Sequence, residues 1–565
     1  MLSMYTIGMY LLDRLYELGI HHVFGVPGDY NLPFLDDIIK HEEITWIGNC
    51  NELNAAYAAD GYARMKGIGA VVTTFGVGEL SALNGIAGAY AEKVPVVQIT
   101  GAPHTDIMDR KLAVHHTLGD GVFDHFFKMF QHITVAQVFL TVENATAEID
   151  RVLSRCWFEK RPVYISLPVN IAKQLVDKPK TKLLIQNQIN NTIEIEHVLE
   201  EISAMVEKSK RPLILADFEV NRYHAEQELH ELMAVTGFPV ATLSMGKGII
   251  DERHPQFIGI YNGNLSLPYV QERVDDSDCI LSIGVQLTDL TSGGFSHRFS
   301  KENTIEISQG VIKIREEKEI VIDCELKELL QKLILFFQSK GNHVPLQVHS
   351  FLSQATDFTE KRPSQKGILI SQKRFWNQLY HFLQPEDVII ADQGTAFYGA
   401  AMMPLPLKSK FIGQPLWGSI GYTLPALLGT QLADVNRRNV LLIGDGAFQM
   451  VGQELSTIMR EKLTSIIFLL NNDGYTIERA IHGEFQIYND LKMWKYCELP
   501  NCLSLEKGNL LIMKIYDEQE LEEALLQASQ STHQLVFIEV VMERSDIPVL
   551  LNGIAQKMRK QNSKS

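Results

Sequence analysis

The 565-residue sequence has only six cysteines, and none of them stands in a CxxC or CxxH spacing. Cysteines so few and so spread fit reduced thiols in a cytosolic protein better than a disulfide framework or a zinc site. Long apolar runs are also missing: Asp13 and Arg14 interrupt the opening segment, and no later run has the roughly 18 consecutive apolar residues of a spanning helix. We therefore expect a cytoplasmic chain with no membrane partner.

Basic residues are in deficit. The chain has 52 Lys and Arg against 68 Asp and Glu, a formal net charge of −16. An acidic surface repels phosphate backbones, which excludes nucleic acid as the main partner. A composition with 45% hydrophobic residues, spread over this length, is that of a globular protein with several domains.

Short apolar runs rich in β-branched residues recur along the chain, with helix-like segments between them. Continuous apolar strands that alternate with helices are typical of parallel sheets covered on both faces. The predicted fold class is therefore α/β, with doubly wound parallel sheets. The runs lie at 70–75, 94–101, 162–168, 212–217, 279–284, 388–392, 440–446 and 465–473.

Two polar, proline-containing stretches, at 173–192 and 338–367, indicate linkers. They divide the chain into three α/β domains and a C-terminal tail. The domains are expected at 1–172, 193–337 and 368–545, with the tail at 546–565. The first and third share a glycine-rich turn, a small-residue helix and a buried strand, which suits either an ancient duplication or any α/β protein.

Polar residues end two neighbouring strands of the third domain. Gly444, Asp445 and Gly446 close one strand, and Asn472 closes the next. Glycines let a backbone approach phosphate, and carboxylate and amide oxygens suit a hard cation such as Mg²⁺. Each half alone is equally typical of an ordinary turn, but ligands bind where parallel strands end.

This pair resembles the signature of the thiamine diphosphate-dependent enzymes, GDG followed at a distance by NN. The resemblance implies thiamine diphosphate and Mg²⁺ as cofactors. It makes the side chains of Asp445 and Asn472 and the carbonyl of Gly474 the metal ligands, with Gly446 and Ala447 against the cofactor. It also implies a pyrimidine-binding first domain, a structural or regulatory central domain, a metal-binding third domain and a tail near the active site.

A glutamate that activates the cofactor is expected in the first domain of this family. The segment 48–64 matches the family pattern, with Glu52 in that position. A glutamate opening a small-residue helix is otherwise explained by the helix dipole alone. Segments 24–36, 113–121 and 471–483 resemble the pyruvate and indolepyruvate decarboxylase branch.

That branch resemblance implies non-oxidative decarboxylation of a 2-oxo acid to an aldehyde and carbon dioxide, through an ylide and an enamine. The groups it places at the reacting carbon are Asp29, His115, His116 and Glu478. They would protonate the enamine carbon before the aldehyde departs. The simpler interpretations are that Asp29 is an ordinary turn residue and that His115 and His116 begin a helix.

Further positions follow from the same resemblance. Cofactor contacts are expected at Gly394, Thr395, Gly418, Ile420 and Ile477, and substrate contacts at Gln393, Phe397, Ile477, Ile554 and Met558. The family more often has Glu where this chain has Asp392. Gln393 and Phe397 resemble members that accept large substrates, whereas Ile477 resembles pyruvate-type enzymes. We predict a branched-chain, aromatic or medium linear 2-oxo acid in preference to pyruvate.

Three other functions stay open at the level of sequence. A carboligase of the acetolactate synthase type shares the cofactor and the domains, but its branch lacks the His115–His116 and Asp29 motifs. A nicotinamide or flavin dehydrogenase is suggested by two Gly-x-Gly turns, although Ser81 and Gln449 stand where a third glycine is needed. A cofactor-free relative is the third. The resemblance also implies a homodimer or homotetramer, because in this family two subunits share each site.

Overall fold

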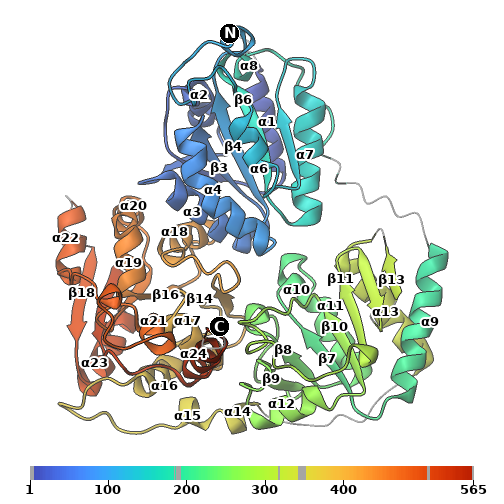
Figure 1. Ribbon diagram of the computed structural model, residues 1–565, viewed down its shortest axis with the longest axis vertical. Helices are drawn as coiled ribbons and strands as arrows, with labels where there is room; N and C mark the ends of the chain where they lie inside the picture. The colour runs from blue at the N-terminus through green and yellow to red at the C-terminus, as the bar shows by residue number, and fades with distance from the viewer. Residues whose placement is uncertain are drawn as a thin grey trace.

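The computed structural model describes residues 5–183, 185, 192–315, 318–322, 324–341, 351–504 and 509–562. Within those ranges the chain forms three sheets, each covered by helices. Figure 1 shows the first domain at the top, the middle domain at the lower right and the third at the lower left. The apolar runs found in the sequence are buried strands of these sheets, and the predicted fold class is confirmed.

The first sheet is parallel throughout and has the strand order β2-β1-β3-β4-β6-β5. Its strands are β1 (His22–Gly25), β2 (Thr45–Gly48), β3 (Gly69–Thr74), β4 (Val96–Ala102), β5 (Ala136–Phe139) and β6 (Val163–Pro168). The helices are α1 (Ile7–Glu17), α2 (Leu32–Lys40), α3 (Glu52–Lys66), α4 (Val77–Ala91), α5 (Thr105–Asp109), α6 (His125–Phe130), α7 (Ala145–Glu159) and α8 (Val169–Ala172). Every residue of β3 and β4 is buried, because helices cover both faces.

The middle sheet, in the order β13-β12-β11-β10-β7-β8-β9, is parallel except at one edge, where β11, β12 and β13 pair antiparallel. Its strands are β7 (Pro212–Ala216), β8 (Val240–Thr242), β9 (Phe257–Ile260), β10 (Cys279–Ile283), β11 (Thr304–Ser308), β12 (Val311–Ile314) and β13 (Lys318–Val321). The helices are α9 (Thr192–Lys208), α10 (Glu219–Arg222), α11 (Glu226–Thr236), α12 (Pro268–Asp275) and α13 (Leu326–Lys340). An antiparallel edge needs only tight turns, so it carries no apolar crossover helix.

The third sheet repeats the topology of the first, in the order β15-β14-β16-β17-β19-β18. Its strands are β14 (Val388–Ala391), β15 (Lys410–Ile412), β16 (Asn439–Gly444), β17 (Ile466–Asn471), β18 (Leu510–Ile515) and β19 (Leu535–Val541). The helices are α16 (Gln372–Phe382), α17 (Thr395–Met402), α18 (Thr423–Ala433), α19 (Asp445–Val451), α20 (Leu455–Arg460), α21 (Thr476–Ile481), α22 (Leu499–Leu503), α23 (Glu518–Gln530) and α24 (Val549–Asn562). A short 3-10 helix, η3 (Gly452–Glu454), follows α19.

Helices α3 and α18 join the first and third domains at very close range. A Cβ added at Gly61 would overlap the backbone of Ala426, and one added at Gly429 would overlap the carbonyl of Ala58. Small residues therefore let the two backbones touch, which explains the alanine-rich sequence of α3. The joint is also polar: Tyr422 donates to Asp60 at 2.5 Å.

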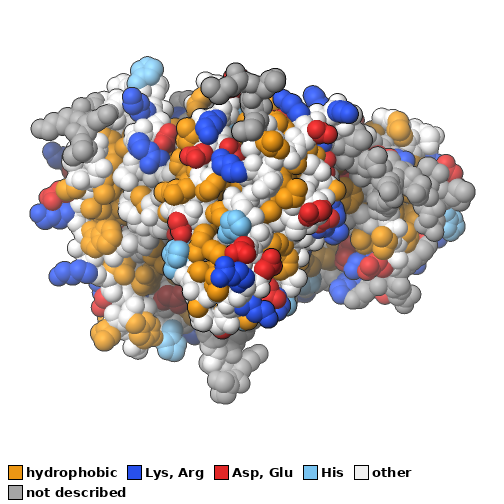
Figure 2. All heavy atoms as spheres, turned by 90° about the horizontal axis from the view of Figure 1, so that it is seen from above, with side chains coloured by type: hydrophobic (Ala, Val, Ile, Leu, Met, Phe, Trp, Pro, Cys, Tyr) orange, Lys and Arg blue, Asp and Glu red, His pale blue; other side chains and the backbone are white. Residues whose placement is uncertain are grey.

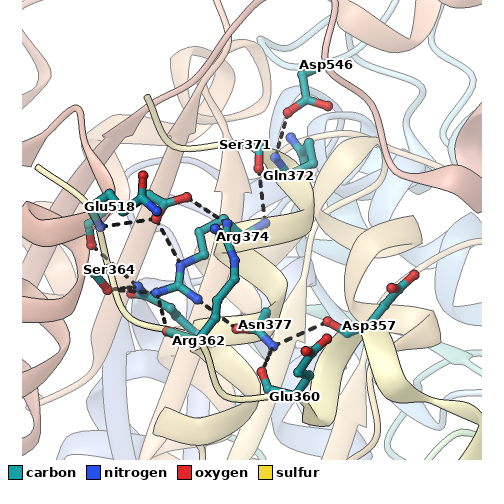
Figure 3. A network of polar contacts seen from close by, with 12 residues as sticks. Asp357, Glu360, Arg362, Ser364, Ser371, Gln372, Arg374, Asn377, Glu518 and Asp546 are labelled. Atoms are coloured by element: carbon teal, nitrogen blue, oxygen red, sulfur yellow. Dashed lines mark hydrogen bonds and ion pairs between the residues drawn. The ribbon is translucent and has the colours of Figure 1, made fainter. Parts of the chain in front are cut away.

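A strap before the third domain contains α14 (Phe351–Gln354) and α15 (Thr356–Thr359) and crosses α16 and α23 (Figure 3). Arg374 of α16 donates to the carbonyl of Arg362 and to Ser364, at 3.1 and 2.7 Å. Arg362 in turn donates to Glu518 of α23 at 2.7 Å. These bonds fix the strap to the third domain.

None of the described helices is long and apolar enough to cross a membrane. On the face seen from above, over the first domain, acidic and basic side chains lie mixed with apolar ones (Figure 2). The acidic residues behind the net charge of −16 therefore do not form a single acidic patch on this face.

Candidate functional site

Three polar groups meet where β16 and β17 end. Asp445 opens α19, and its Oδ2 accepts the N–H of Gly474 at 2.9 Å. The amide of Asn472 places one terminal atom 3.1 Å from the carbonyl oxygen of Gly474 and 3.3 Å from Oδ1 of Asp445. With the amide oxygen of Asn472 as that atom, three oxygens lie close together, one each from Asn472, Gly474 and Asp445. A cation would stabilise this arrangement. The structure thus brings together all three residues predicted as metal ligands.

The carboxyl group of Asp445 is almost completely buried, and burial raises its pKa to about 6. A nearby cation would favour its charged form and offset that cost. Gly446 and Ala447 follow in the first turn of α19, where backbone N–H groups lack partners within the helix.

An open glycine cradle lies beside these groups. A Cβ added at Gly394 or at Gly444 would meet no atom within 4 Å, so both backbones border free space. Gly394 precedes α17, and Thr395 lies with its hydroxyl 3.5 Å from the amide nitrogen assigned to Asn472. Backbone open to space at a helix N-terminus suits a phosphate group.

Asp392 holds the turn that carries Gly418 and Ile420. It accepts from the N–H of Gly421 at 3.2 Å and from the hydroxyl of Thr423 at 2.5 Å, and burial raises its pKa to about 6. Gly418 has a positive φ of 68°, and Ile420 packs partly buried on the core. No role for Asp392 was predicted; its only signal in the sequence is that a carboxylate directly follows a fully apolar strand.

A carboxylate and two imidazoles meet on the first domain. Nε2 of His115 lies 2.5 Å from Oδ2 of Asp29, and Nε2 of His116 lies 3.6 Å from Oδ1. The ring of Tyr30 stacks on His115, with centroids 4.9 Å apart. Asp29 and His115 stay exposed, so the cluster faces outward from the domain.

Glu52 is the first residue of α3, whose N-cap Asn51 accepts from the N–H of Asn54 at 2.8 Å. Its side chain is half-buried, and burial raises the pKa of the carboxyl group. A Cβ added at Gly78 would lie 3.1 Å from Oε1 of Glu52. Glu52 therefore rests against the start of α4, on the same domain as the histidines.

Glu478 lies exposed in the first turn of α21. Ile477, beside it, packs in one apolar cluster with Phe397 of α17 and with Ile554 and Met558 of α24. Phe397 is 1% exposed and packs on Phe411, with ring centroids 5.5 Å apart. Gln393 donates to the hydroxyl of Tyr398 at 3.0 Å. The tail helix thus covers the elements that carry the predicted substrate residues.

Family models match all three domains of the chain. Residues 5–127 match the thiamine pyrophosphate enzyme N-terminal TPP binding domain, 199–333 the central domain, and 392–540 the C-terminal TPP binding domain. Thiamine pyrophosphate is another name for thiamine diphosphate. The class of protein is therefore a thiamine diphosphate enzyme with the three-domain α/β fold of that group.

Curated relatives narrow the class. An alpha-keto-acid decarboxylase of Mycolicibacterium paratuberculosis is 45% identical over 547 residues, 97% of this chain and 95% of the relative. Proteins of the same name from Mycobacterium leprae and Mycobacterium tuberculosis are each 43% identical, over 560 and 557 residues, 99% of this chain in both cases and 97% and 98% of the relatives. The chain belongs to the thiamine diphosphate-dependent 2-oxo acid decarboxylases, which are carboxy-lyases. The dehydrogenase and cofactor-free alternatives fall away.

Proposed function

We propose that the chain converts a branched-chain, aromatic or medium linear 2-oxo acid to an aldehyde and carbon dioxide, with Mg²⁺ holding the cofactor. The observation that carries this proposal is the meeting of Asp445, Asn472 and Gly474 at the ends of two parallel strands. A hard cation prefers such oxygens as ligands and can bind the oxygens of a diphosphate at the same time.

The described residues fit the cofactor. Asp445, Asn472 and Gly474 would hold the cation, while the open backbone at Gly394 and Gly444 leaves room for phosphate oxygens. When bound, thiamine diphosphate supplies the carbon nucleophile and the electron sink for loss of carbon dioxide. Burial favours the protonated carboxyl of Glu52, which can donate from its oxygen to a ring nitrogen.

Proton transfer is the role we assign to Asp29, His115, His116 and Glu478. After carbon dioxide leaves, the former carbonyl carbon of the substrate must gain a proton before the aldehyde departs. The short contact between Asp29 and His115 orients one imidazole, and His116 lies near enough to share the proton.

The substrate class rests on Phe397, Ile477, Ile554 and Met558, which belong to one apolar cluster and which we expect to form a wall around the acyl end of the substrate. Such a wall suits an apolar side chain, whereas Gln393 adds a polar group beside it. One methylene changes selectivity by about 1–3 kcal/mol, so several 2-oxo acids should be accepted with graded efficiency.

A homodimer, or a tetramer made of two such dimers, is the assembly we propose. Among the described residues, no hydrogen bond or ion pair joins the Asp29 cluster or Glu52 to Asp445 and Asn472. Apolar side chains lie exposed beside both groups: Val77 at the start of α4 is 54% exposed, and Met450 on α19 is 55% exposed. A second copy that covers them would complete each site. A cytoplasmic location stays a proposal that rests on the cysteine pattern.

Two experiments test these assignments. Carbon dioxide release from a panel of 2-oxo acids, with and without cofactor and Mg²⁺, measures the reaction and its preference; acyloin as the sole product would favour a carboligase. Glu52→Gln and Asp445→Ala should each fold and lose turnover. If two subunits share each site, mixing these inactive variants restores activity, since one site of each hybrid dimer is intact. No recovery in proven hybrids would refute the shared site.

A further inference from the structure

A tight turn between β3 and α4 lies beneath two of the groups assigned to the reaction. Gly76 adopts φ 64° and ψ −93°, a conformation that a residue with a side chain rarely adopts. A Cβ there would overlap the carbonyl oxygen of His116. Two residues on, Gly78 faces Oε1 of Glu52. A shift of this turn would therefore move both His116 and Glu52.

One buried carboxylate fixes the turn. Glu79, on α4, is 0% exposed, and its Oε1 accepts the N–H of Gly76 at 2.8 Å. Its Oε2 accepts the hydroxyl of Tyr164 at 2.7 Å, and Tyr164 belongs to β6, on the far side of β4 from β3. The carboxylate thus ties the helix start to another strand of the sheet.

Burying the carboxyl group of Glu79 costs free energy, which argues against a role limited to capping the start of α4. Burial raises the pKa of Glu79 to about 7, while the Gly76 amide and the Tyr164 hydroxyl oppose that rise. Tyr164 is the titratable group in contact with it, and Thr100 and Ser166 bond to that tyrosine. A serine would satisfy an N-terminal N–H at lower cost, but it would not reach β6.

We propose that Glu79 is a positioning residue that holds the Gly76–Gly78 turn, and through it sets the places of Glu52 and His116. The proposal rests on the roles given above to Glu52 and His116. Glu79 touches neither reacting group; it acts through the amide of Gly76. Misplacement of reacting groups by about 1 Å can cost on the order of a hundredfold in rate.

The test compares two variants of the full-length holoenzyme. Glu79→Leu removes the acceptor of the Gly76 N–H, whereas Glu79→Gln keeps it. We expect Glu79→Leu to lower kcat by about ten- to a hundredfold with a much smaller change in KM, and Glu79→Gln to restore most of kcat. Hydrogen–deuterium exchange should quicken in peptides covering 75–80 and 113–118 in Glu79→Leu but not in Glu79→Gln.

Two more variants keep the result decisive. Tyr164→Phe retains the ring and removes one donor, so it should fold even if Glu79→Leu does not, with a smaller loss of kcat and faster exchange at 75–80. Asp37→Asn is the control: Asp37 is another buried carboxylate of this domain, bonded to Lys173 at 2.8 Å, and its loss should lower the melting temperature and spare kcat.

If Glu79→Leu folds and its kcat and hydrogen exchange are unchanged, the proposal is overturned. If Glu79→Leu does not fold, the same result in Tyr164→Phe would overturn it. Equal loss of kcat in Glu79→Leu and Glu79→Gln would also overturn it, because the glutamine keeps the acceptor. Failure of the underlying site assignment is distinguishable, since Glu52→Gln would then stay active.

Discussion

Glu454 should be a principal anchor of the first domain on the third. This carboxylate of η3 is 0% exposed and accepts from the side-chain amides of Asn49 and Asn54, both at 2.8 Å, and from the N–H of Cys50 at 3.2 Å. Glu454→Ala removes the acceptor of all three hydrogen bonds. Asn54 is fully buried and cannot turn to water, whereas Asn49 is partly exposed and Cys50 is exposed.

An unsatisfied buried donor costs about 1–3 kcal/mol. The full cost for Asn54 and a partial cost for the two more exposed donors together lower the free energy of unfolding by about 3 kcal/mol. Urea unfolding of the cofactor-free protein, followed by tryptophan fluorescence, measures it. The matched control is Glu498→Ala, which breaks an exposed pair with Lys495 and should cost no more than about 1 kcal/mol. Equal losses in both variants would refute the reasoning. Cofactor affinity should also fall in Glu454→Ala, because the segment Asn49–Asn54 contains Glu52.

Three further outcomes are expected. Asp445→Ala should abolish Mg²⁺-dependent cofactor binding in equilibrium dialysis while leaving the fold intact by circular dichroism; undiminished binding would contradict the metal assignment. Burial raises the pKa of Asp392 from 3.8 to about 6, so the folded state binds the proton more tightly and its stability declines as pH rises through that window. Urea titrations at several pH values should show a smaller decline for Asp392→Asn. Ile477→Val should raise kcat/KM for bulky relative to small 2-oxo acids by up to about tenfold, and an unchanged ratio would place Ile477 outside the substrate wall.

Much of the third domain could be predicted because its signals are local. Asp445 and Asn472 each follow a buried strand, and adjacent parallel strands bring their carboxyl ends to one edge. Edge strands gave weaker signals: β2 and β18 are only partly buried, β2 lacks a continuous apolar run, and Lys514 interrupts the apolar residues of β18. The antiparallel edge of the middle sheet depends on tight turns rather than on apolar periodicity.

Other features depend on contacts between distant segments, which no local pattern reveals. The meeting of Asp29 with His115 was inferred only by resemblance, because a long stretch of chain separates them. The roles of Asp392, Glu79 and Glu454 were missed for the same reason. Each is a buried carboxylate whose partners come from another strand, turn or domain. In the sequence each is one more acidic residue among 68.

The backbone contact between α3 and α18 limits how this enzyme can be recombined with its relatives. Because neither Gly61 nor Gly429 leaves room for a methyl group, the two helices are complementary as a pair. A chimera that takes its first domain from one parent and its third from another would need both helices from the same source. Library designs that place crossover points outside this pair should yield folded proteins far more often than those that separate it.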